Sequence, residues 1–581
     1  MVIMLGGSVL PAKQYTVIVA RGGIVPRCCS NGTSVLHPNA RNMSAKYRAA
    51  SAVATPTMDI SEKVASFLAI WCLGLVSLLR RSATIPMDFP PRSNDITADG
   101  EQHQPDLEMY TPKPSKVQRL AAILSIVCAG AALISDGYQN SLMTMTNVLF
   151  GIEYKKQYTS TVSTRVSNAL LVGEIIGQVV IGLTCDYMGR KTALVATTVL
   201  IVVGGILATA AHGKTIEGMF WMLVVSRGIV GFGTGGEYPA SSTAASEAAN
   251  EAALTKRGPI FIMVTNFPLA FGGPLAISIF LIVLAAAGEN HLSTVWRVCF
   301  GIGCIFPLTV FYFRLKMATS YLYKKGAIKK NVPYFLVLKY YWKTLIGTCG
   351  AWFLYDFITF PNGVFSATIL ASIVPDSATN LQKTGEWQLL LGTIALPGVL
   401  VGAYLCNIIG RRATMMLGFS GYIIFGLIIG CAFEQLSKIV PLFVIFYGLM
   451  MSMGNLGPGD MIGLLSSESY ATAVRGTCYG LSAALGKVGA AVGTQCFKPI
   501  QANLGKKWTF IIAAICGVSG ILVTYFFIPH ITGEDLRVED AKFEEYLLKN
   551  GWTGSLGATE SEEDLKDQET NIELANDSEK S

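Results

Sequence analysis

Six ionisable side chains lie inside long apolar stretches of this sequence, where a charge is costly. A charged group near the centre of a bilayer costs at least about 2.5–3.5 kcal/mol, so it is usually turned inward and paired. Acids outnumber the lysine in this set, and we therefore expect some acids to carry a proton part of the time. Such a set could bind an anion at the lysine and move protons through the acids. The six are Asp136, Glu174, Glu237, Asp356, Asp460 and Lys487.

Asp356 and Lys487 are expected to lie at a similar depth. Asp356 follows Lys343 by 13 residues and Lys487 follows Arg475 by 12. At about 1.5 Å per residue, each therefore lies nearly 20 Å from the basic end of its helix. We interpret Lys487 as a ligand for an anionic group and Asp356 as a proton carrier. The alternative is a structural salt bridge between these two residues.

The composition indicates which kind of protein holds these charges. Hydrophobic residues make up 51% of the 581 residues, charged residues only 14%, and the mean hydropathy is +0.46. This is too apolar for a soluble protein of this length. Apolar runs of roughly 20 residues are long enough to span about 30 Å of hydrocarbon. We predict an all-α membrane protein with twelve such spans, near residues 118–140, 166–186, 192–211, 218–240, 259–287, 295–313, 344–371, 387–408, 413–433, 440–465, 472–496 and 508–529.

Basic residues collect in segments that this spacing places on one side of the membrane. The segment 314–343 holds eight Lys and Arg and no acid. The stretches "GRK" (189–191), "TKRG" (255–258) and "GRR" (410–412) fall on the same side. Because cytoplasmic loops carry the excess of Lys and Arg, we predict that both termini are cytosolic.

The two halves of the apolar region repeat one another. "GAALISD" ends at Asp136, and the similar "GAWFLYD" ends at Asp356 in the second half. A six-helix unit duplicated in the same orientation is typical of transporters that rock two halves around a central site. We predict an N-terminal half at 116–313, a basic cytosolic linker at 314–343 and a C-terminal half at 344–529. Three further pairs recur at nearly the same offset as Asp136 and Asp356: Asp186 and Asn407, Glu237 and Asp460, and Arg257 and Arg475.

The two ends of the chain differ in composition from this region. Residues 530–581 hold 15 Asp and Glu against five Lys and Arg, so we predict an acidic cytosolic tail. Residues 1–115 are predicted to be a poorly structured cytosolic extension, or an over-extended gene model with the true start at Met58, Met87 or Met109. A thirteenth span at residues 64–79 is the alternative, although this apolar run is short for a span.

Several chemistries find no support in the residue patterns. The 13 cysteines show no spacing typical of metal ligands. No GxxxxGKS loop and no nucleophile–base pattern occurs. We expect no metal, no cofactor, no nucleic-acid partner and no enzymatic or ATP-driven activity.

Several motifs resemble those of one superfamily. "DYMGRK" after the second span and "RGIVGFGTGGEYP" in the fourth resemble signatures of the major facilitator superfamily. "GGEYPASSTAASE", "WFLYD" and "RGTCYGLSAALGKVGA" resemble its phosphate:proton symporter branch. "SDGYQN" and the segment from "LYKKGAIKK" to "FITFPNG" look like the fungal glycerophosphodiester permeases, which take up glycerophosphoinositol or glycerophosphocholine. The resemblance covers about residues 115–552 and implies the major facilitator fold, with twelve transmembrane helices in two six-helix pseudo-repeats.

The resemblance also implies roles for particular side chains. Gln139 stands where the phosphate symporters have an acid, Phe360 where they have a tyrosine, and Glu237 where they usually have an aspartate. Fewer acids and a lost phenol hydroxyl favour a bulkier, singly charged phosphodiester. For Trp352, packing between helices is the alternative to a role in the pocket. The implied proton-coupling residues are Asp356, Asp136 and Glu237; the implied substrate ligands are Lys487, Tyr238, Trp352, Asp136, Gln139 and Phe360; the implied gate consists of Asp186, Arg190 and Arg411.

The expected function is proton-coupled uptake of glycerophosphodiesters across the plasma membrane by alternating access, by a chain that acts as a monomer in the bilayer. Inorganic phosphate is the alternative substrate. A sugar porter is less favoured, because the "PESPR" and "PETKG" motifs expected after spans six and twelve are replaced by "MATSYLYKK" and "IPHITGEDL". A nutrient receptor that does not transport would keep the same site residues.

Overall fold

The computed structural model describes residues 133–252, 254–315, 323, 332–373, 380–531, 533 and 535–552. All of them belong to one compact unit, Pro91–Ser581. The predictions for residues 1–115, for most of the linker after residue 315 and for the tail after residue 552 lie outside the described residues. Within the described residues every regular element is a helix, which agrees with the all-α prediction.

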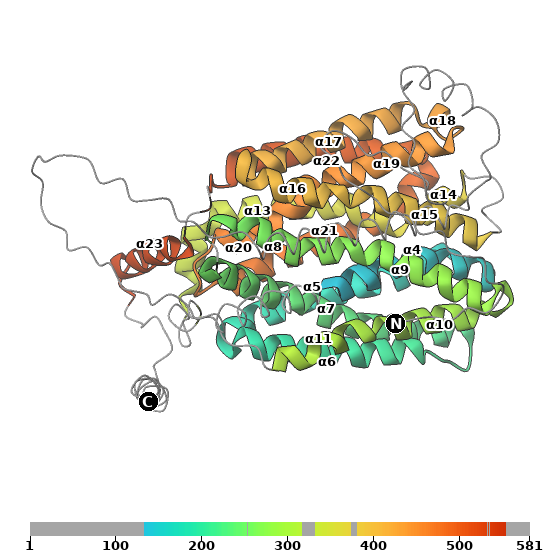
Figure 1. Cartoon of the computed structure of the whole chain (residues 1–581), viewed down its shortest axis with the longest axis horizontal. Coiled ribbons are helices and arrows are strands. Elements are labelled where there is room, and N and C mark those ends of the chain that lie inside the picture. The colour runs from blue at the N-terminus through green and yellow to red at the C-terminus, as the bar shows by residue number, and fades with distance from the viewer. Residues whose placement is uncertain are drawn as a thin grey trace, which may run out of the picture. The chain divides into compact units, whose positions relative to one another are not determined.

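The helices form two sets that follow each other in the chain. The N-terminal set consists of α4 (Leu133–Glu153), α5 (Ser160–Met188), α6 (Arg190–Thr209), α7 (Ile216–Ala252), α8 (Arg257–Val264), α9 (Asn266–Ala287), α10 (Leu292–Gly303) and α11 (Ile305–Leu315). The C-terminal set consists of α13 (Tyr334–Val364), α14 (Ser366–Ala371), α15 (Leu381–Ala395), α16 (Pro397–Ile408), α17 (Arg411–Cys431), α18 (Phe433–Leu436), α19 (Val440–Gly454), α20 (Asp460–Glu468), α21 (Arg475–Asn503) and α22 (Lys507–Phe527). Figure 1 shows α6 and α11 at one edge of the bundle and α17 and α22 at the other. The two sets meet where α21 packs on α5.

Proline and glycine break several spans into two helices. α15 ends at Ala395 and α16 begins at Pro397. Residues Asn455–Gly459 join α19 to α20 as a π-helical turn that contains Pro458. Because proline has no N–H donor, the regular hydrogen-bond ladder cannot continue through this turn. Such turns often lie at functional sites, and this one opens towards the central cavity described below.

The same tight turn occurs once in each set of helices. Gly189 joins α5 to α6 with φ 89°, and Gly410 joins α16 to α17 with φ 86°. These angles lie in the region that favours glycine. The separation of the two turns along the chain is nearly that of Asp136 and Asp356, as the sequence repeat predicts.

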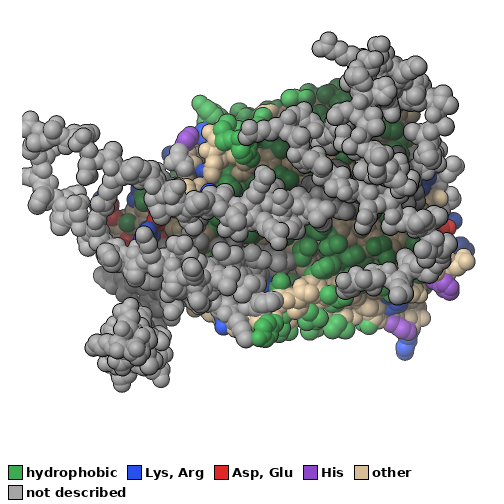
Figure 2. Space-filling model, viewed as in Figure 1, with side chains coloured by type: hydrophobic (Ala, Val, Ile, Leu, Met, Phe, Trp, Pro, Cys, Tyr) green, Lys and Arg blue, Asp and Glu red, His purple; other side chains and the backbone are tan. Residues whose placement is uncertain are grey.

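The outer faces of the helices suit a lipid environment. Nine helical segments of the described residues are long and apolar enough to cross a membrane. Of the other three predicted spans, those near 344–371 and 472–496 overlap α13 and α21. The span near 118–140 overlaps α4 only from residue 133, since residues 118–132 lie outside the described residues, so the total of twelve stays a prediction. Figure 2 shows hydrophobic side chains over much of the visible outer face between the two ends of the bundle. Exposed examples are Ile176, Val225, Ile282, Ile346 and Ile445.

Candidate functional site

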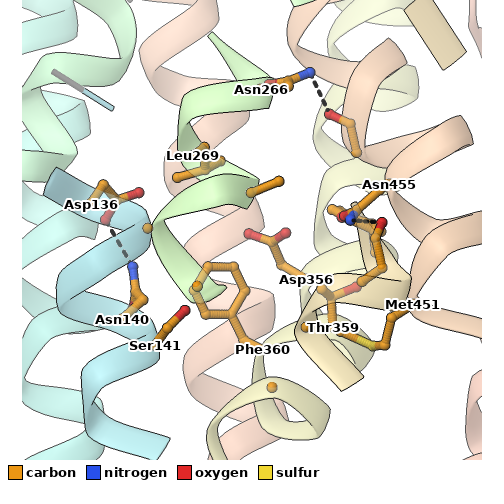
Figure 3. A pocket seen from close by; sticks show the side chains of 18 of the residues that line it. Asp136, Asn140, Ser141, Asn266, Leu269, Asp356, Thr359, Phe360, Met451 and Asn455 are labelled. Atoms are coloured by element: carbon orange, nitrogen blue, oxygen red, sulfur yellow. Dashed lines mark hydrogen bonds between the residues drawn. The ribbon is translucent and has the colours of Figure 1, made fainter. Parts of the chain in front are cut away.

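A cavity of about 250 Å³ lies between the two sets of helices. The N-terminal set contributes residues of α4, α7 and α9, and the C-terminal set contributes residues of α13, α15, α20 and α21 among others. Figure 3 shows the side chains of Asp356 and Phe360 between α4 and α9 on one side and Asn455 and Met451 on the other. A ligand held here would contact both sets at once.

The carboxylate of Asp136 is held in a buried hydrogen-bond network. Asn140 Nδ2 donates to Asp136 Oδ1 at 2.8 Å and to Glu174 Oε1 at 3.1 Å, and the Tyr238 hydroxyl donates to Asp136 Oδ2 at 2.7 Å. The network continues into the C-terminal set, because Lys487 Nζ forms an ion pair with Glu174 Oε2 at 3.1 Å. Acids from α4 and α5 thus lie beside the one deep lysine that the sequence singled out.

Aromatic rings surround the Lys487 ammonium group. It lies 3.8 Å from the centroid of the Phe360 ring and 5.2 Å from that of the Tyr238 ring. Both distances suit a cation–π interaction. The rings hold the ammonium group at the cavity wall, where it can meet an anionic ligand.

Asp356 lies in the same cavity in a different electrostatic setting. It is 2% exposed, and its Oδ2 atom has no hydrogen-bond partner among the described residues. The alternative of a salt bridge between Asp356 and Lys487 is therefore wrong for this conformation, since Lys487 pairs with Glu174. A carboxyl that faces a cavity without a partner can take up a proton or accept a hydrogen bond from a ligand.

Trp352 lines the cavity one helical turn before Asp356. Its ring meets the Tyr479 ring edge to face, with centroids 5.5 Å apart. On the other side a Cβ at Gly486 would lie 2.2 Å from Trp352 Cδ1, so only glycine allows α21 to approach this closely. Trp352 thus both walls the pocket and packs between helices, and the two interpretations open at the sequence level are compatible.

Two of the residues predicted for the site do not line the cavity. Glu237 forms a fully buried ion pair with Arg314 of α11 at 2.5 Å, and Gln139 lies against Gly303 of α10. The other residues predicted to couple protons or bind substrate, namely Asp136, Tyr238, Trp352, Asp356, Phe360 and Lys487, all line it.

The cavity is also lined by side-chain amides that sequence reasoning did not single out. Asn266 Nδ2 donates to the backbone oxygen of Gly459 at 3.0 Å and lies 3.4 Å from Asp460 Oδ1. Asn455 Nδ2 donates to the backbone oxygen of Ala395 at 2.9 Å. Gln388 also lines the cavity. The signal available for Asn455 was the "NLGPG" break inside an apolar span.

Crossed ion pairs join the two sets of helices at one end of the bundle. Arg190 binds Asp186 at 2.5 Å and Glu247 at 3.1 Å, and Arg475 of the C-terminal set binds the same Glu247 at 3.3 Å. Asp186 also accepts a hydrogen bond of 2.7 Å from the backbone of Thr477. The N-terminal acids therefore hold both their own arginine and the start of α21.

The C-terminal set repeats this arrangement. Glu468 binds Arg411 at 3.2 Å and Arg257 of the N-terminal set at 2.9 Å. Glu468 follows Glu247 at the same offset at which Gly410 follows Gly189. Each glutamate thus joins an arginine of its own set to one of the other set. After the gating role expected for three of its members, we call the following residues the gate network: Asp186, Arg190, Glu247, Arg257, Arg411, Glu468 and Arg475.

The chain is similar to proteins of one transporter family. A family described as "Sugar (and other) transporter" matches residues 122–543. The chain belongs to this family. It is 61% identical over 451 residues to Glycerophosphoinositol permease 1 of Candida albicans. The aligned region covers 77% of this chain and 86% of that protein. It is 58% identical over 452 residues to Glycerophosphoinositol transporter 1 of Saccharomyces cerevisiae, covering 78% and 87%.

A solved transporter structure shows the same fold. The major facilitator superfamily proton:xylose symporter XylE matches with a TM-score of 0.63 at 18% identity, covering 74% of this chain and 100% of that one. At this identity the likeness concerns the fold alone. The family match and the permease relatives confirm the transporter family predicted from the sequence, and the structural likeness agrees with the predicted all-α fold.

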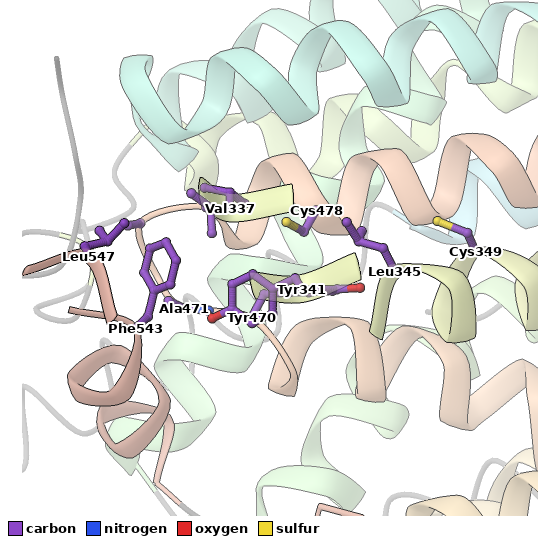
Figure 4. Close-up of a cluster of buried hydrophobic side chains, with 11 residues drawn as sticks. Val337, Tyr341, Leu345, Cys349, Tyr470, Ala471, Cys478, Phe543 and Leu547 are labelled. Carbon is purple, nitrogen blue, oxygen red and sulfur yellow. Dashed lines mark hydrogen bonds between the residues drawn. The ribbon is translucent and has the colours of Figure 1, made fainter. Parts of the chain in front are cut away.

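A further helix of this transporter packs beside the gate network. Helix α23 (Leu536–Lys549) buries Phe543 and Leu547 against Tyr341 and Tyr470 (Figure 4). Asp540 Oδ2 accepts a 2.8 Å hydrogen bond from the Thr472 hydroxyl. The helix therefore rests on the C-terminal set.

The residue before α23 reaches the N-terminal set. Asp535 Oδ1 accepts a 3.0 Å hydrogen bond from Asn250 at the end of α7. Burial alone would raise the pKa of Asp535, but hydrogen bonds from Arg537 and Asn250 lower it to about 2. The segment 535–549 thus spans both sets at the gate.

Proposed function

We propose that this protein carries glycerophosphodiesters into the cell together with protons, by alternating access at the plasma membrane. The observation that carries the proposal is the cavity in which Lys487 is paired with Glu174 while the Oδ2 atom of Asp356 has no hydrogen-bond partner among the described residues. The two relatives named as glycerophosphoinositol carriers, at 58–61% identity, support the substrate class.

The lysine is the phosphate ligand in this proposal. Its ammonium group offers three N–H donors, and the Glu174 carboxylate lies on one side of this group. A phosphodiester oxygen takes another, beside Phe360. A ring without a hydroxyl suits a phosphodiester, which has fewer free oxygens to bind than inorganic phosphate.

Protons balance the charge of the loaded cavity. Three acids, Asp136, Glu174 and Asp356, lie near one cation, Lys487, and an anionic substrate would add a further negative charge to this set. Burying further negative charge is costly, so protonation of an acid makes loading favourable. Asp356 is the proton carrier because no described group holds its Oδ2 atom.

In this proposal the gate network controls whether the cavity is open or closed to the cytosol. Its crossed ion pairs hold the two sets together at the cytosolic end, so breaking them opens the cavity to the cytosol. We place both termini in the cytosol and assign transport to the monomer, since the cavity and the gate network are built within one chain. The protein has no enzymatic role in this proposal.

Inorganic phosphate is the second candidate substrate. The chain is 24% identical over 492 residues to a rice protein named "Probable inorganic phosphate transporter 1-12", and it shares a deep lysine and aspartate with that branch by the resemblance described above. A sugar substrate is supported only by the general description of the family and by the fold that this chain shares with XylE.

Uptake by cells that lack their own carriers tests the proposal. Labelled glycerophosphoinositol, glycerophosphocholine and phosphate are offered at external pH 5 and 7.5 to cells expressing the full chain. We expect diester uptake that rises at low pH and is lost with Asp356→Asn. Uptake of phosphate alone would assign the protein to the phosphate carriers, and no flux from a chain shown to be at the surface would favour a receptor.

A further inference from the structure

A second hollow lies on the lipid-facing side of the helices, away from the central cavity. It is a groove of about 980 Å³ between α5, α7 and the last turns of α21. Its walls include Val172, Ile176, Val225 and Phe232, of which Val172 and Ile176 are 49% exposed and Val225 is 60% exposed. Such a hollow among exposed apolar side chains is open to the acyl chains of the bilayer.

Two basic side chains lie at the end of the groove opposite the gate network. Arg165 stands in the second turn of α5, which begins at Ser160, and Lys498 stands near the end of α21. Neither forms an ion pair with an acid among the described residues. Arg165 lies 4.3 Å over the Trp221 ring, and a tryptophan beside a basic residue is typical of the level where membrane meets water.

A buried amide adds a polar contact just below this basic pair. Asn168 is 5% exposed and lines the groove. Its Nδ2 atom donates to the backbone oxygen of Ala491 on α21 at 3.3 Å. Its Oδ1 atom has no partner among the described residues, so the amide still offers an acceptor to a head-group hydroxyl or ammonium.

The order of these side chains along the membrane normal matches a phospholipid. Polar and basic residues, Asn168 among them, occupy the end at Arg165, and the wall from Ala169 to Ile176 is apolar. At about 1.5 Å per residue the stretch from Arg165 to Ile176 is about 16 Å long, and its apolar part is about 10 Å long. Half of the bilayer's hydrocarbon thickness is about 15 Å, so the groove accommodates the part of one acyl chain that lies nearest its head group.

We propose that this groove holds one anionic phospholipid of the leaflet opposite the gate network, with its phosphate between Arg165 and Lys498 and one acyl chain along α5 and α7. Charge complementarity selects an anionic lipid, because two cations without acid partners meet the head group. The lipid contacts both sets of helices, since α21 provides Lys498. Binding therefore favours the arrangement in which these contacts form, and the lipid acts on the alternation without entering the substrate cavity.

Native mass spectrometry of the purified full chain tests the proposal. The protein is taken from nanodiscs of phosphatidylcholine with a minor fraction of phosphatidylserine or phosphatidylinositol. We expect one anionic lipid to be retained per chain, and the Arg165→Gln/Lys498→Gln variant to lose about tenfold or more in affinity, given about 1 kcal/mol per basic residue near anionic lipid. The control is Lys438→Gln, an exposed lysine that does not line the groove, and it should bind lipid as wild type does.

A second variant separates lipid binding from a folding defect. Val225→Trp fills the groove without changing charge, whereas Val203→Trp adds the same ring at an exposed position on α6 outside the groove. We expect only Val225→Trp to release the lipid while both variants unfold thermally like wild type. The proposal would be overturned if Arg165→Gln/Lys498→Gln and Val225→Trp retained the anionic lipid as well as their controls do. Displacement of the lipid by an equal concentration of soluble glycerophosphoinositol would also overturn it, because the acyl chain would then contribute nothing.

Discussion

Lys487 on α21 pairs with Glu174 on α5 at 3.1 Å, so the deep cation ties the C-terminal set of helices to the N-terminal set at the cavity wall. Asp356, on the neighbouring α13, faces the same cavity with its Oδ2 atom unpaired among the described residues. Glu174 is therefore paired with the lysine, whereas Asp356 is available to take up a proton. This division separates anion binding from proton carriage and allows each to be tested alone.

The pair of Lys487 and Glu174 can be removed together. Replacing the lysine alone would leave a buried carboxylate without its cation, which costs about 3–5 kcal/mol. We expect Lys487→Gln/Glu174→Gln to reach the surface but to lose diester uptake about tenfold or more, because a hydrogen bond to a charged group contributes about 1.5–3 kcal/mol. The control removes the surface pair Lys549 and Glu545 in the same way. Wild-type uptake by the first variant would contradict the assignment of Lys487.

Asp356→Asn is expected to uncouple transport from the proton gradient. Asparagine keeps the shape of the protonated acid but cannot release a proton. In proteoliposomes we therefore expect accumulation driven by an inward proton gradient to vanish, while exchange of labelled for unlabelled diester continues. Asp136→Asn is a comparison within the cavity, since its carboxylate is already held by Asn140 and Tyr238. Gradient-driven accumulation by Asp356→Asn would show that another acid carries the proton.

The sequence was sufficient to identify several residues that the fold brings together at the cavity. Asp356 and Lys487 stand at matching depths in apolar spans, Asp136 occupies the position of Asp356 in the first half of the repeat, and charged groups in lipid turn inward whatever the details of packing. The repeat offset also anticipated the paired turns at Gly189 and Gly410. These features depend on the length and polarity of each span, which the sequence contains.

Which side chain each buried residue contacts depends on the rotation of its helix about the helix axis. This rotation could not be predicted from the sequence. Successive residues of a helix point about 100° apart, so Tyr238 faces the cavity while Glu237 beside it faces Arg314. Likewise Asn140 contacts Asp136, whereas Gln139 turns towards α10. Glu174 was recognised as a buried acid, but its pairing with Lys487 requires the packing of α5 on α21.

Equivalent glutamates of the gate network should have equivalent effects. Glu247→Gln and Glu468→Gln each remove the acid that joins two arginines, and we expect both to open the gate. Loss of more than about 1.4 kcal/mol from the closed state shifts the population about tenfold. The readout is maleimide labelling of Cys185 and Cys406, both buried at this end, located by mass spectrometry. Glu434→Gln, at an exposed site on α18, is the control. An increase in cysteine labelling in only one of the two glutamate variants would contradict the equivalence of the two halves of the gate network.

The contact of Asp535 with Asn250 should not explain stimulation of uptake by acid. The pKa of Asp535 is lowered from 3.8 to about 2, so the stabilisation from this carboxylate is present above about pH 4 and is lost only as pH falls from about 4 to 2. We expect α23 to stay docked at both pH 5 and pH 7.5, as measured by limited proteolysis after α23. The ratio of uptake at the two pH values should be unchanged in Asp535→Asn. Release of α23 at pH 5 would contradict this prediction.

Phe360→Tyr should shift preference towards inorganic phosphate. The Phe360 ring lies 3.8 Å from the Lys487 ammonium group, so a hydroxyl on that ring would place a new donor beside the proposed phosphate site. Inorganic phosphate has more free oxygens than a diester and gains more from the donor, whereas the bulkier diester loses room. We expect the ratio of phosphate to glycerophosphoinositol uptake to rise severalfold, a change of about 1 kcal/mol for one hydrogen bond. Phe357→Tyr, which adds the same hydroxyl on α13 beside Phe353 and outside the cavity, should leave the ratio unchanged. An equal ratio in both variants would mean that the phosphate group does not lie beside Phe360.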